Sequence, residues 1–332
     1  MHGRIWITLA SLAVGSLPIT LSSAPVAAYE KVASGERKCF VVDAVAGGAA
    51  IVNLTPVLAE GAGDAKLISS DVGRGPLASN VNFGPGTVDP NVAVAPVGLN
   101  GRVCVVNSHH TRVHVIADHL GTIASASYAA ATSSGAPDRR VDTRDGTGGD
   151  RLGPSGQLCF GVKGDPGDAA LLNLTPVRSA AAGDGQLVSS DVKQNPPTAS
   201  NVNFGPGGLD PNIAIAPIGS DGQVCFVNSK HTSVDLVADH LGTIAGDVYT
   251  PATPSGGPDR RVDTRVGDGG TRLRPSARLC FAVRGEPGDA AIVNLTPVRA
   301  DGAGDGKLVS SDVTRPPVVS NVNFAPGTVD PN

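Results

Sequence analysis

Aspartate and histidine are adjacent at two places in this chain, Asp118-His119 and Asp239-His240. Such a pair could act in acid–base catalysis or bind a metal ion. Consecutive residues of a strand point to opposite faces of a sheet, however, so the two side chains of each pair are not expected to meet at one ligand. We therefore expect each aspartate to bond the backbone at a strand end, beside a partly exposed histidine. His110 and His231 lie next to threonines in predicted turns, and the same structural interpretation applies to them.

An aspartate and an arginine two positions apart form a second recurring combination, Asp142/Arg144 and Asp263/Arg265. Residues at i and i+2 of a strand share a face, so each pair could belong to a patch that binds a sugar or a peptide. We favour a structural ion pair that holds the strand in place. If such a pair is exposed, it contributes less than about 1 kcal/mol to stability.

Other patterns typical of catalytic sites are weak. The nucleophile elbow Gly-x-Ser-x-Gly is absent, and the repeated Ser69-Ser70-Asp71 and Ser189-Ser190-Asp191 have no base nearby in the sequence. Glycine-rich strings such as 302–306 precede no predicted helix, so they do not match a phosphate-binding loop. A triad assembled from distant residues and the two carboxylates of a glycosidase remain open alternatives. We expect a protein that is not an enzyme and that has no cofactor.

The elements that carry these residues belong to three copies of one pattern of about 120 residues. Three strings mark the copies: Cys39-Phe40 recurs at 159–160 and 280–281, Asn53-Leu54-Thr55-Pro56-Val57 at 173–177 and 294–298, and Ser79-Asn80-Val81-Asn82-Phe83 at 200–204 and 320–324. This period is too long for a solenoid repeat and fits whole domains in tandem. The Asn-Leu-Thr strings formally match an N-glycosylation sequon, but each lies in a predicted strand before proline, so we interpret them as structural.

The third copy is incomplete. The chain ends at Asn332, before the strands equivalent to 212–244. Half a sandwich would expose strand edges and an apolar face. We therefore expect the sequence to be a piece of a longer protein, and completion of the fold by another chain is the alternative.

Five cysteines follow the repeat. In an oxidising compartment we expect the disulfides Cys39–Cys104 and Cys159–Cys225, one within each complete copy. Closing a loop of that size should stabilise a copy by about 4 kcal/mol. Cys280 is expected to remain an unpaired thiol, because its copy ends before a second cysteine is reached. A metal site is disfavoured, because the close Cys-x-x-Cys or His-x-x-x-His spacing that zinc prefers is missing.

The N-terminus indicates export. Residues 1–28 have a short basic start, an apolar run from Ile5 to Leu21 and small residues before Tyr29, which is typical of a cleaved signal peptide. An uncleaved membrane anchor is the alternative, but the run is near the lower length limit for a span and contains Pro18. We expect a secreted or cell-surface protein without a membrane span after cleavage. The net charge of −4 gives no electrostatic reason to expect nucleic acid as a partner.

Short apolar runs between turns predict an all-β fold. The 43 glycines and 26 prolines separate runs of Val, Ile, Leu and Ala, and no window shows the apolar spacing of a helix. In the second copy one run extends from Ala169 to Thr175 and stops at Pro176, and Asp221-Gly222 predicts a hairpin turn between 212–218 and 223–228. We expect tandem β-sandwich modules with Greek-key or jelly-roll connections, and a barrel is the alternative.

Two stretches rich in Pro and small residues divide the copies. An Arg-Val-Asp-Thr-Arg strand follows each stretch, and we assign it to the copy that comes after it; a boundary behind this strand is the alternative. The expected organisation is a signal peptide 1–28, copy one 29–124, a linker 125–136, copy two 137–245, a linker 246–257 and the incomplete copy three 258–332.

The order of these strings resembles a repeat of secreted and cell-surface proteins of actinobacteria. The resemblance rests on Arg-Val-Asp-Thr-Arg, Asn-Leu-Thr-Pro-Val, Ser-Asn-Val-Asn-Phe, the Asp-Gly turn and Val-Asp-Leu-Val-Ala-Asp, and it covers nearly all of the chain after residue 28. The usual aromatic ending after the last strand is replaced here by His-Leu-Gly-Thr-Ile. The resemblance implies an exported β-rich module and brings no catalytic residues.

These observations favour a non-enzymatic exported repeat protein that acts as a cell-surface spacer, adhesin or wall-associated scaffold. The alternative is a set of carbohydrate- or cell-wall-binding modules accessory to a hydrolase. Sugar-binding surfaces usually expose Trp or Tyr, and the one Trp lies within residues 1–28. Cell-wall glycan or other surface proteins are the expected partners.

Overall fold

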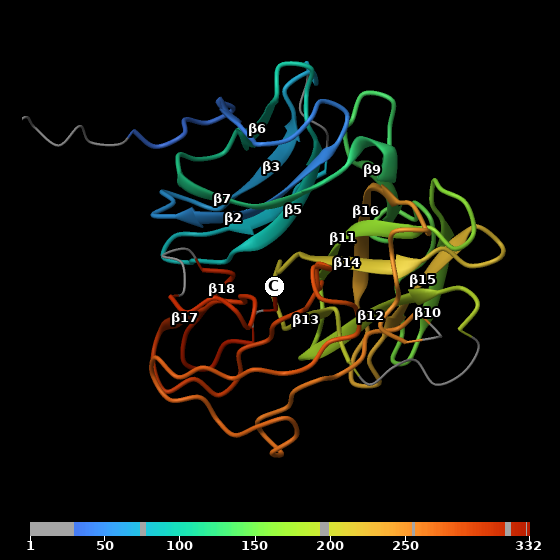
Figure 1. Ribbon diagram of the computed structural model, residues 1–332. Helices are drawn as coiled ribbons and strands as arrows, with labels where there is room; N and C mark the ends of the chain where they lie inside the picture. Colours follow the sequence, from blue (N-terminus) through green and yellow to red (C-terminus); the bar gives the residue numbers. More distant parts are fainter. Residues whose placement is uncertain (1–29, 74–77, 193–198, 254–255, 316–319, 330) are drawn as a thin grey trace, which may run out of the picture. The chain divides into compact units, whose positions relative to one another are not determined.

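The computed structural model describes residues 30–73, 78–192, 199–253, 256–315, 320–329 and 331–332. The predicted signal peptide and its cleavage site lie outside the described residues. The described chain consists of strands and loops, with a single 3-10 turn at Ser125–Ser127 (Figure 1). It contains no helix of the length and apolarity needed to cross a membrane. The all-β prediction is confirmed, and the sheets are separate and antiparallel rather than closed into a barrel.

Copy one consists of two antiparallel sheets. The first has the order β1 (Arg37–Val41), β6 (Arg102–Asn107), β3 (Gly63–Ser69) and β4 (Val81–Phe83). The second has the order β5 (Asn91–Pro96), β2 (Ala49–Val57) and β7 (His114–Ile123). Buried side chains of both sheets, including Leu54 of β2 and Leu67 of β3, form one apolar core.

Copy two has the same arrangement with additional strands. Its first sheet has the order β10 (Gln157–Gly161), β15 (Gln223–Asn228), β12 (Gly183–Ser189) and β13 (Val202–Phe204). Its second sheet has the order β14 (Asn212–Pro217), β11 (Ala169–Val177), β16 (Asp235–Ile244) and β8 (Tyr128–Ala130), and β9 (Asp138–Asp142) also pairs with β16.

The last strands of the two copies differ in burial because their neighbours differ. Both β8 and β9 pair with the outer edge of β16, and all ten residues of β16 are buried. The Asp-Thr-Arg strand is therefore part of the copy-two sheet, and the stretch 125–136, which we expected to be a linker, contributes β8 to the same sheet. No described strand pairs with the outer edge of β7, and none of its residues is buried.

Two details of the predicted strands are wrong. The turn at Asp221-Gly222 exists, and Gly222 has the positive φ of 77° that such a turn requires, but it does not form a hairpin. β14 pairs with β11 and β15 pairs with β10 and β12, so the turn carries the chain from one sheet to the other. In addition, β11 continues through Pro176 to Val177. Its pairing with β14 ends at Leu174, so at Pro176 the strand has a neighbour only in β16, and the missing N–H is tolerated there.

Copy three contains little regular structure in its described residues. One short antiparallel pair is present, β17 (Gly304–Gly306) with β18 (Val322–Phe324). This pair corresponds to β3 with β4 and to β12 with β13, whose registers begin with the same glycine–phenylalanine partners. The first part of the copy, up to Arg299, forms loops and turns that are mostly exposed.

The cores of copies one and two fill the same space with side chains of different size on neighbouring strands. Phe226 on β15 is fully buried, and a Cβ atom built on Gly185 of β12 would overlap its ring. The corresponding residues of copy one, Val105 and Ala65, are also buried and distribute the same volume differently. In each copy the size of one side chain of the pair therefore matches the space that the other leaves.

Gly185→Ala should destabilise copy two by about 1–3 kcal/mol, because the added methyl group overpacks the core against Phe226. The double variant Gly185→Ala/Phe226→Val reproduces the pair of copy one, so its loss of stability should be smaller than the sum of the two single losses. Urea unfolding followed by circular dichroism measures all three variants. Additive losses would contradict the proposed match.

Candidate functional site

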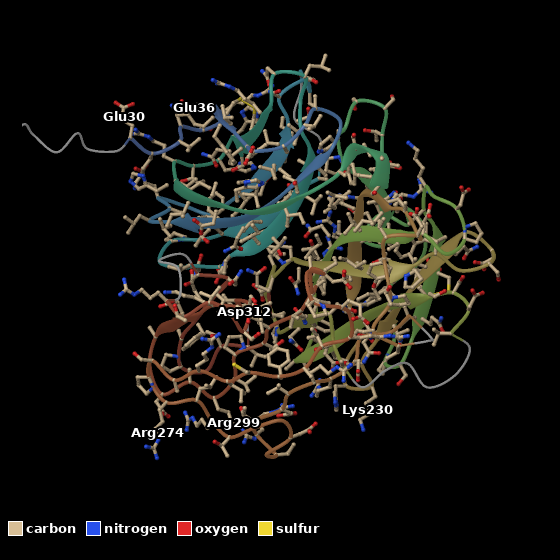
Figure 2. The ribbon with its side chains drawn as sticks, in the orientation of Figure 1. Glu30, Glu36, Lys230, Arg274, Arg299 and Asp312 are labelled. Atoms are coloured by element: carbon tan, nitrogen blue, oxygen red, sulfur yellow. A yellow bond between two sulfur atoms is a disulfide. The ribbon has the colours of Figure 1, made fainter. Side chains whose placement is uncertain are left out.

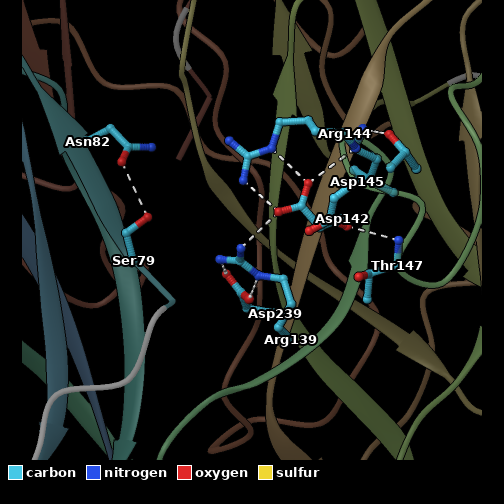
Figure 3. A network of polar contacts seen from close by, with 10 residues as sticks. Ser79, Asn82, Arg139, Asp142, Arg144, Asp145, Thr147 and Asp239 are labelled. Carbon is cyan, nitrogen blue, oxygen red and sulfur yellow. Dashed lines mark hydrogen bonds and ion pairs between the residues drawn. The ribbon is translucent and has the colours of Figure 1, made fainter.

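A cluster of four charged side chains joins the Asp-Thr-Arg strand to the last strand of copy two (Figure 3). Arg139 on β9 donates from Nε to Oδ1 of Asp239 on β16 at 2.6 Å and from Nη2 to Oδ2 at 3.2 Å. Arg139 also donates from Nη1 to Oδ2 of Asp142 at 3.1 Å. Arg144 holds the other side of Asp142, with Nε 2.7 Å from Oδ1 and Nη2 2.5 Å from Oδ2.

The positions of these groups follow from the strand register. Asp239 and Arg139 are paired residues of neighbouring antiparallel strands, and Val237 faces Asp142 in the same ladder. The turn after β9 is closed by two backbone hydrogen bonds between Asp142 and Thr147 and by Thr147 N donating to Asp145 Oδ1 at 3.0 Å. This turn brings Arg144 back over Asp142.

The two carboxylates differ in their environments. Hydrogen bonds from Arg144 lower the pKa of Asp142 below its usual value. Burial raises the pKa of Asp239, and the hydrogen bonds and charge of Arg139 act in the opposite direction. The Asp239 side chain is 1% exposed, so its charge depends on the partner that Arg139 provides.

The binding candidates Asp142 and Arg144 are thus partners of each other. The pair Asp263 and Arg265 in copy three repeats the arrangement: Arg265 Nε and Nη2 lie 2.8 and 2.6 Å from Asp263, and Arg260 adds a third contact at 3.1 Å. Arg265 lowers the pKa of Asp263. Both pairs are structural ion pairs, and a patch for sugar or peptide would have to break them.

The expectation for Asp239 and His240 is wrong in detail. Asp239 lies in the middle of β16 and pairs with Arg139 instead of bonding the backbone at a strand end. His240 is fully buried, because β9 pairs with β16 at this position and places Asp138 opposite His240. Its Nε2 lies 3.3 Å from Oγ1 of Thr243. Burial lowers the pKa of His240 to about 4. In copy one, where no such cover exists, His119 is exposed.

His110 and His231 lie exposed in turns, as expected. Among the described residues, no group of three or more His, Cys, Asp or Glu side chains is placed to hold a metal ion. The repeated Ser70 and Asp71 bond the turn at 98–100: Ser70 Oγ lies 2.5 Å from Asn100 Oδ1, and Leu99 N donates to Asp71 Oδ2 at 2.9 Å.

Asparagine side chains link the three copies in a closed cycle. Three hydrogen bonds make the cycle, each from the asparagine of an Asp-Pro-Asn string to the asparagine of an Asn-Leu-Thr string: Asn91 to Asn173 at 3.0 Å, Asn212 to Asn294 at 3.0 Å, and Asn332 to Asn53 at 2.9 Å. The bonds therefore run from copy one to two, from two to three, and from three to one.

Each link of this cycle is doubled by a bond in the opposite direction. The receiving asparagine donates its Nδ2 to a serine carbonyl of the preceding copy: Asn173 to Ser79 at 2.7 Å, Asn294 to Ser200 at 2.9 Å, and Asn53 to Ser320 at 3.1 Å. Neither the cycle nor the contact between Arg139 and Asp239 was predicted. The shared spacing of the Asn-Leu-Thr and Asp-Pro-Asn strings was the signal, but no local pattern says which copy supplies the partner.

A small hollow lies where the Asp-Pro-Asn segments meet. It measures about 20 Å³ and is lined by residues of all three copies, among them Pro90, Pro211 and Pro331. This space suits about one water molecule rather than an organic ligand. A larger hollow of about 230 Å³ is lined by residues of one exposed turn of copy three, 283–291.

Both expected disulfides are present. Cys39 on β1 pairs with Cys104 on β6, and Cys159 on β10 with Cys225 on β15, in each case between directly opposed residues of neighbouring strands. Cys280 is a free, exposed thiol. The two disulfides indicate an oxidising environment outside the cytoplasm.

No protein-family model matches this chain, and no curated protein matches it significantly.

Replacing Arg139 by Gln should cost about 3–5 kcal/mol at neutral pH, because it leaves Asp239 charged and buried without its partner. The cost should shrink as the pH falls, since protonation of Asp239 removes the unpaired charge. Arg140→Gln is the matched control on the same strand: its ion pair with Asp138 is partly exposed and its Nε donates to Gly161 O at 2.8 Å, so their loss should cost only about 1–2 kcal/mol. Urea midpoints at several pH values measure both variants, and equal losses would contradict the assigned role of Arg139.

The buried imidazole should also make copy two sensitive to acid. The folded-state pKa of His240 is about 4, against 6.5 in the unfolded chain, so the unfolded chain binds more protons between these values. The contribution of His240 to stability is complete above pH 6.5 and is lost as the pH falls toward 4. An NMR titration of the His240 ring protons measures the pKa directly. A value at or above 6.5 would contradict burial as its cause.

Proposed function

We propose that this protein is an exported, non-catalytic scaffold or spacer of a cell surface, built from tandem β-sandwich modules. The observation that carries the proposal is the closed cycle of asparagine hydrogen bonds. Because each copy is bonded to both others, the copies act as one body instead of independent domains on flexible linkers. A body of this kind can hold a position or transmit a load between two attachment points.

The use of the recurring charged residues supports the same function. Asp142, Arg144, Asp239 and Arg139 bond one another, and in copy three Arg260 and Arg265 both bond Asp263. Groups that are already engaged in ion pairs are poor candidates for general acids, general bases or nucleophiles. Such ion pairs instead suit a structural role, in which they hold a strand in its sheet.

The disulfides and the resemblance support the location. Cys39–Cys104 and Cys159–Cys225 suit an extracytoplasmic protein, and the predicted signal peptide supplies the route. The resemblance to an actinobacterial repeat adds cell-surface attachment to the proposal. Wall glycan or other surface proteins are then the partners, and an adhesive role would use the same linked copies.

The proposal is tested by expressing the complete chain in an exporting bacterial host and fractionating the culture. The protein should be found in the medium or the wall fraction, shortened before Tyr29. Alkylation before reduction should label one thiol, Cys280, and alkylation after reduction should label five. Cytoplasmic retention with all thiols reduced would reject export.

A second measurement addresses catalysis. The purified protein should show no turnover above background on polysaccharide, peptidoglycan and ester substrates. Turnover that depends on the folded protein would reject the scaffold in favour of a hydrolase. Retention by purified cell wall in a pull-down would define the attachment partner, whereas a protein that is not retained would have to be held by other surface proteins.

A further inference from the structure

The disulfide Cys39–Cys104 is accessible from one side. β1 is the edge strand of its sheet, and Cys39 on this strand is exposed. Cys104 on β6 has no exposed surface and packs with Ile68, Val72 and Val106. A thiol in solution therefore reaches the bond at the sulfur of Cys39 and not at that of Cys104.

A guanidinium group lies beside the accessible sulfur. Arg37 is two residues before Cys39 on the same face of β1, and its Nε donates to Cys39 Sγ at 3.4 Å. Its Nη1 donates to Val72 O at 2.6 Å, and its Nη2 donates to the carbonyls of Ser69 at 3.3 Å and Ser70 at 2.5 Å. These oxygen partners are carbonyls rather than carboxylates, so they hold the group in place and leave its charge uncompensated.

The disulfide of copy two has the same arrangement without the charge. Cys159 on the edge strand β10 is exposed, and Cys225 on β15 is fully buried. The residue in the position of Arg37 is Gln157, whose Nε2 lies 3.5 Å from Cys159 Sγ. The two disulfides thus differ in the charge of the donor at the exposed sulfur, and copy two provides an internal comparison.

A positive charge at this place favours exchange with thiols. In thiol–disulfide exchange a thiolate attacks one sulfur of the disulfide, and the other sulfur leaves as a thiolate. Negative charge is therefore distributed over all three sulfur atoms while the bond breaks. An arginine beside them stabilises this charge, as it stabilises a thiolate, and a neutral amide does so less.

We propose that Cys39–Cys104 is a thiol–disulfide exchange site, which reacts with small thiols in preference to the disulfide of copy two. A small thiolate attacks Cys39 Sγ and bonds to it. The bond between the two cysteines breaks, and its electron pair passes to Cys104, whose thiolate takes up a proton from the solvent. A second thiolate attacks the small-molecule sulfur of this mixed disulfide and releases Cys39 as a thiolate beside Arg37. Two small thiols are oxidised to their disulfide, and the protein disulfide is reduced by two electrons.

The proposal goes beyond the scaffold function, because it concerns the reactivity of one bond and does not depend on export. Reduction removes the covalent tie between β1 and β6, whereas their backbone pairing from Arg37↔Val106 to Val41↔Arg102 can remain. Exchange therefore weakens the edge of copy one and leaves copy two closed.

The test follows both disulfides in the purified chain, with Cys280 alkylated beforehand so that its thiol takes no part. The probe is mercaptoethanol, whose only ionisable group is the thiol. Samples are quenched with acid at intervals and alkylated, and mass spectrometry of the digest measures the reduced fraction of each bond. We expect the disulfide of copy one to be reduced at least about threefold faster than that of copy two. Early samples should contain the mixed disulfide on Cys39 and not on Cys104.

Exchanging the two donors should exchange the rates. Arg37→Gln should slow the reduction of copy one by at least about threefold, and Gln157→Arg should speed the reduction of copy two by a similar factor. Loss of the carbonyl contacts of Arg37 would by itself loosen β1 and speed reduction. Slower reduction of the Arg37→Gln variant therefore identifies the charge as the cause.

Two control variants remove a positive charge elsewhere. Lys38→Gln changes the next residue of β1, whose side chain lies on the opposite face of the strand and pairs with Glu36. Arg274→Gln changes an exposed residue of copy three (Figure 2), which contains neither disulfide. Both variants should leave the two rates unchanged, and circular dichroism of every variant verifies the fold.

Three results would overturn the proposal: equal rates for the two disulfides of the unaltered chain, an Arg37→Gln variant that is reduced as fast or faster, or a mixed disulfide on Cys104. The second result would mean that Arg37 shields the bond instead of activating it. None of the three bears on the scaffold function, which is tested by fractionation and turnover.

Discussion

The arrangement of the protein depends on asparagine side chains that are buried between copies. Asn53 and Asn173 have no exposed surface, and Asn91 has 1%. A primary amide removed from water must find partners in the protein, and leaving it unbonded costs about 1–3 kcal/mol. Here the partner of each Asn-Leu-Thr asparagine lies in a different copy. Copies one and two, and copies three and one, therefore cannot separate without exposing or orphaning buried amides, whereas Asn294, in the link between copies two and three, is exposed.

The fold class could be predicted because short stretches of sequence are enough to identify the strands and turns. Runs such as Ala169 to Thr175, with turns rich in Gly and Pro between them, are enough to predict antiparallel strands. The paired cysteines also suffice, because each complete copy offers one choice of partner. The failure at Asp221-Gly222 is instructive: Asp-Gly specifies the positive φ of a tight turn, but whether the flanking strands pair or part is decided by the cores that they enter.

The candidate site was predicted less well, because its contacts are long-range. Asp142 and Arg144 are two residues apart, and their ion pair follows from that spacing. Arg139 and Asp239 are 100 residues apart, and only the pairing of β9 with β16 brings them together. The same pairing buries His240, which the sequence placed near the surface. One strand addition therefore accounts for both errors, and it was hidden because the sequence does not state which edge a strand will join.

The matched pairs Phe226/Gly185 and Val105/Ala65 have a consequence for how the chain reaches its native state. Tandem copies of similar sequence can exchange strands with one another during synthesis, and such exchange is a characteristic failure of repeat proteins. If β15 took the place of β6 beside β3, Phe226 would meet Ala65 and collide with it. The reciprocal exchange would put Val105 beside Gly185 and leave a void, which is also unfavourable. The difference in side-chain size thus favours pairing of each strand within its own copy, although the backbone hydrogen bonds alone would allow β15 and β6 to exchange.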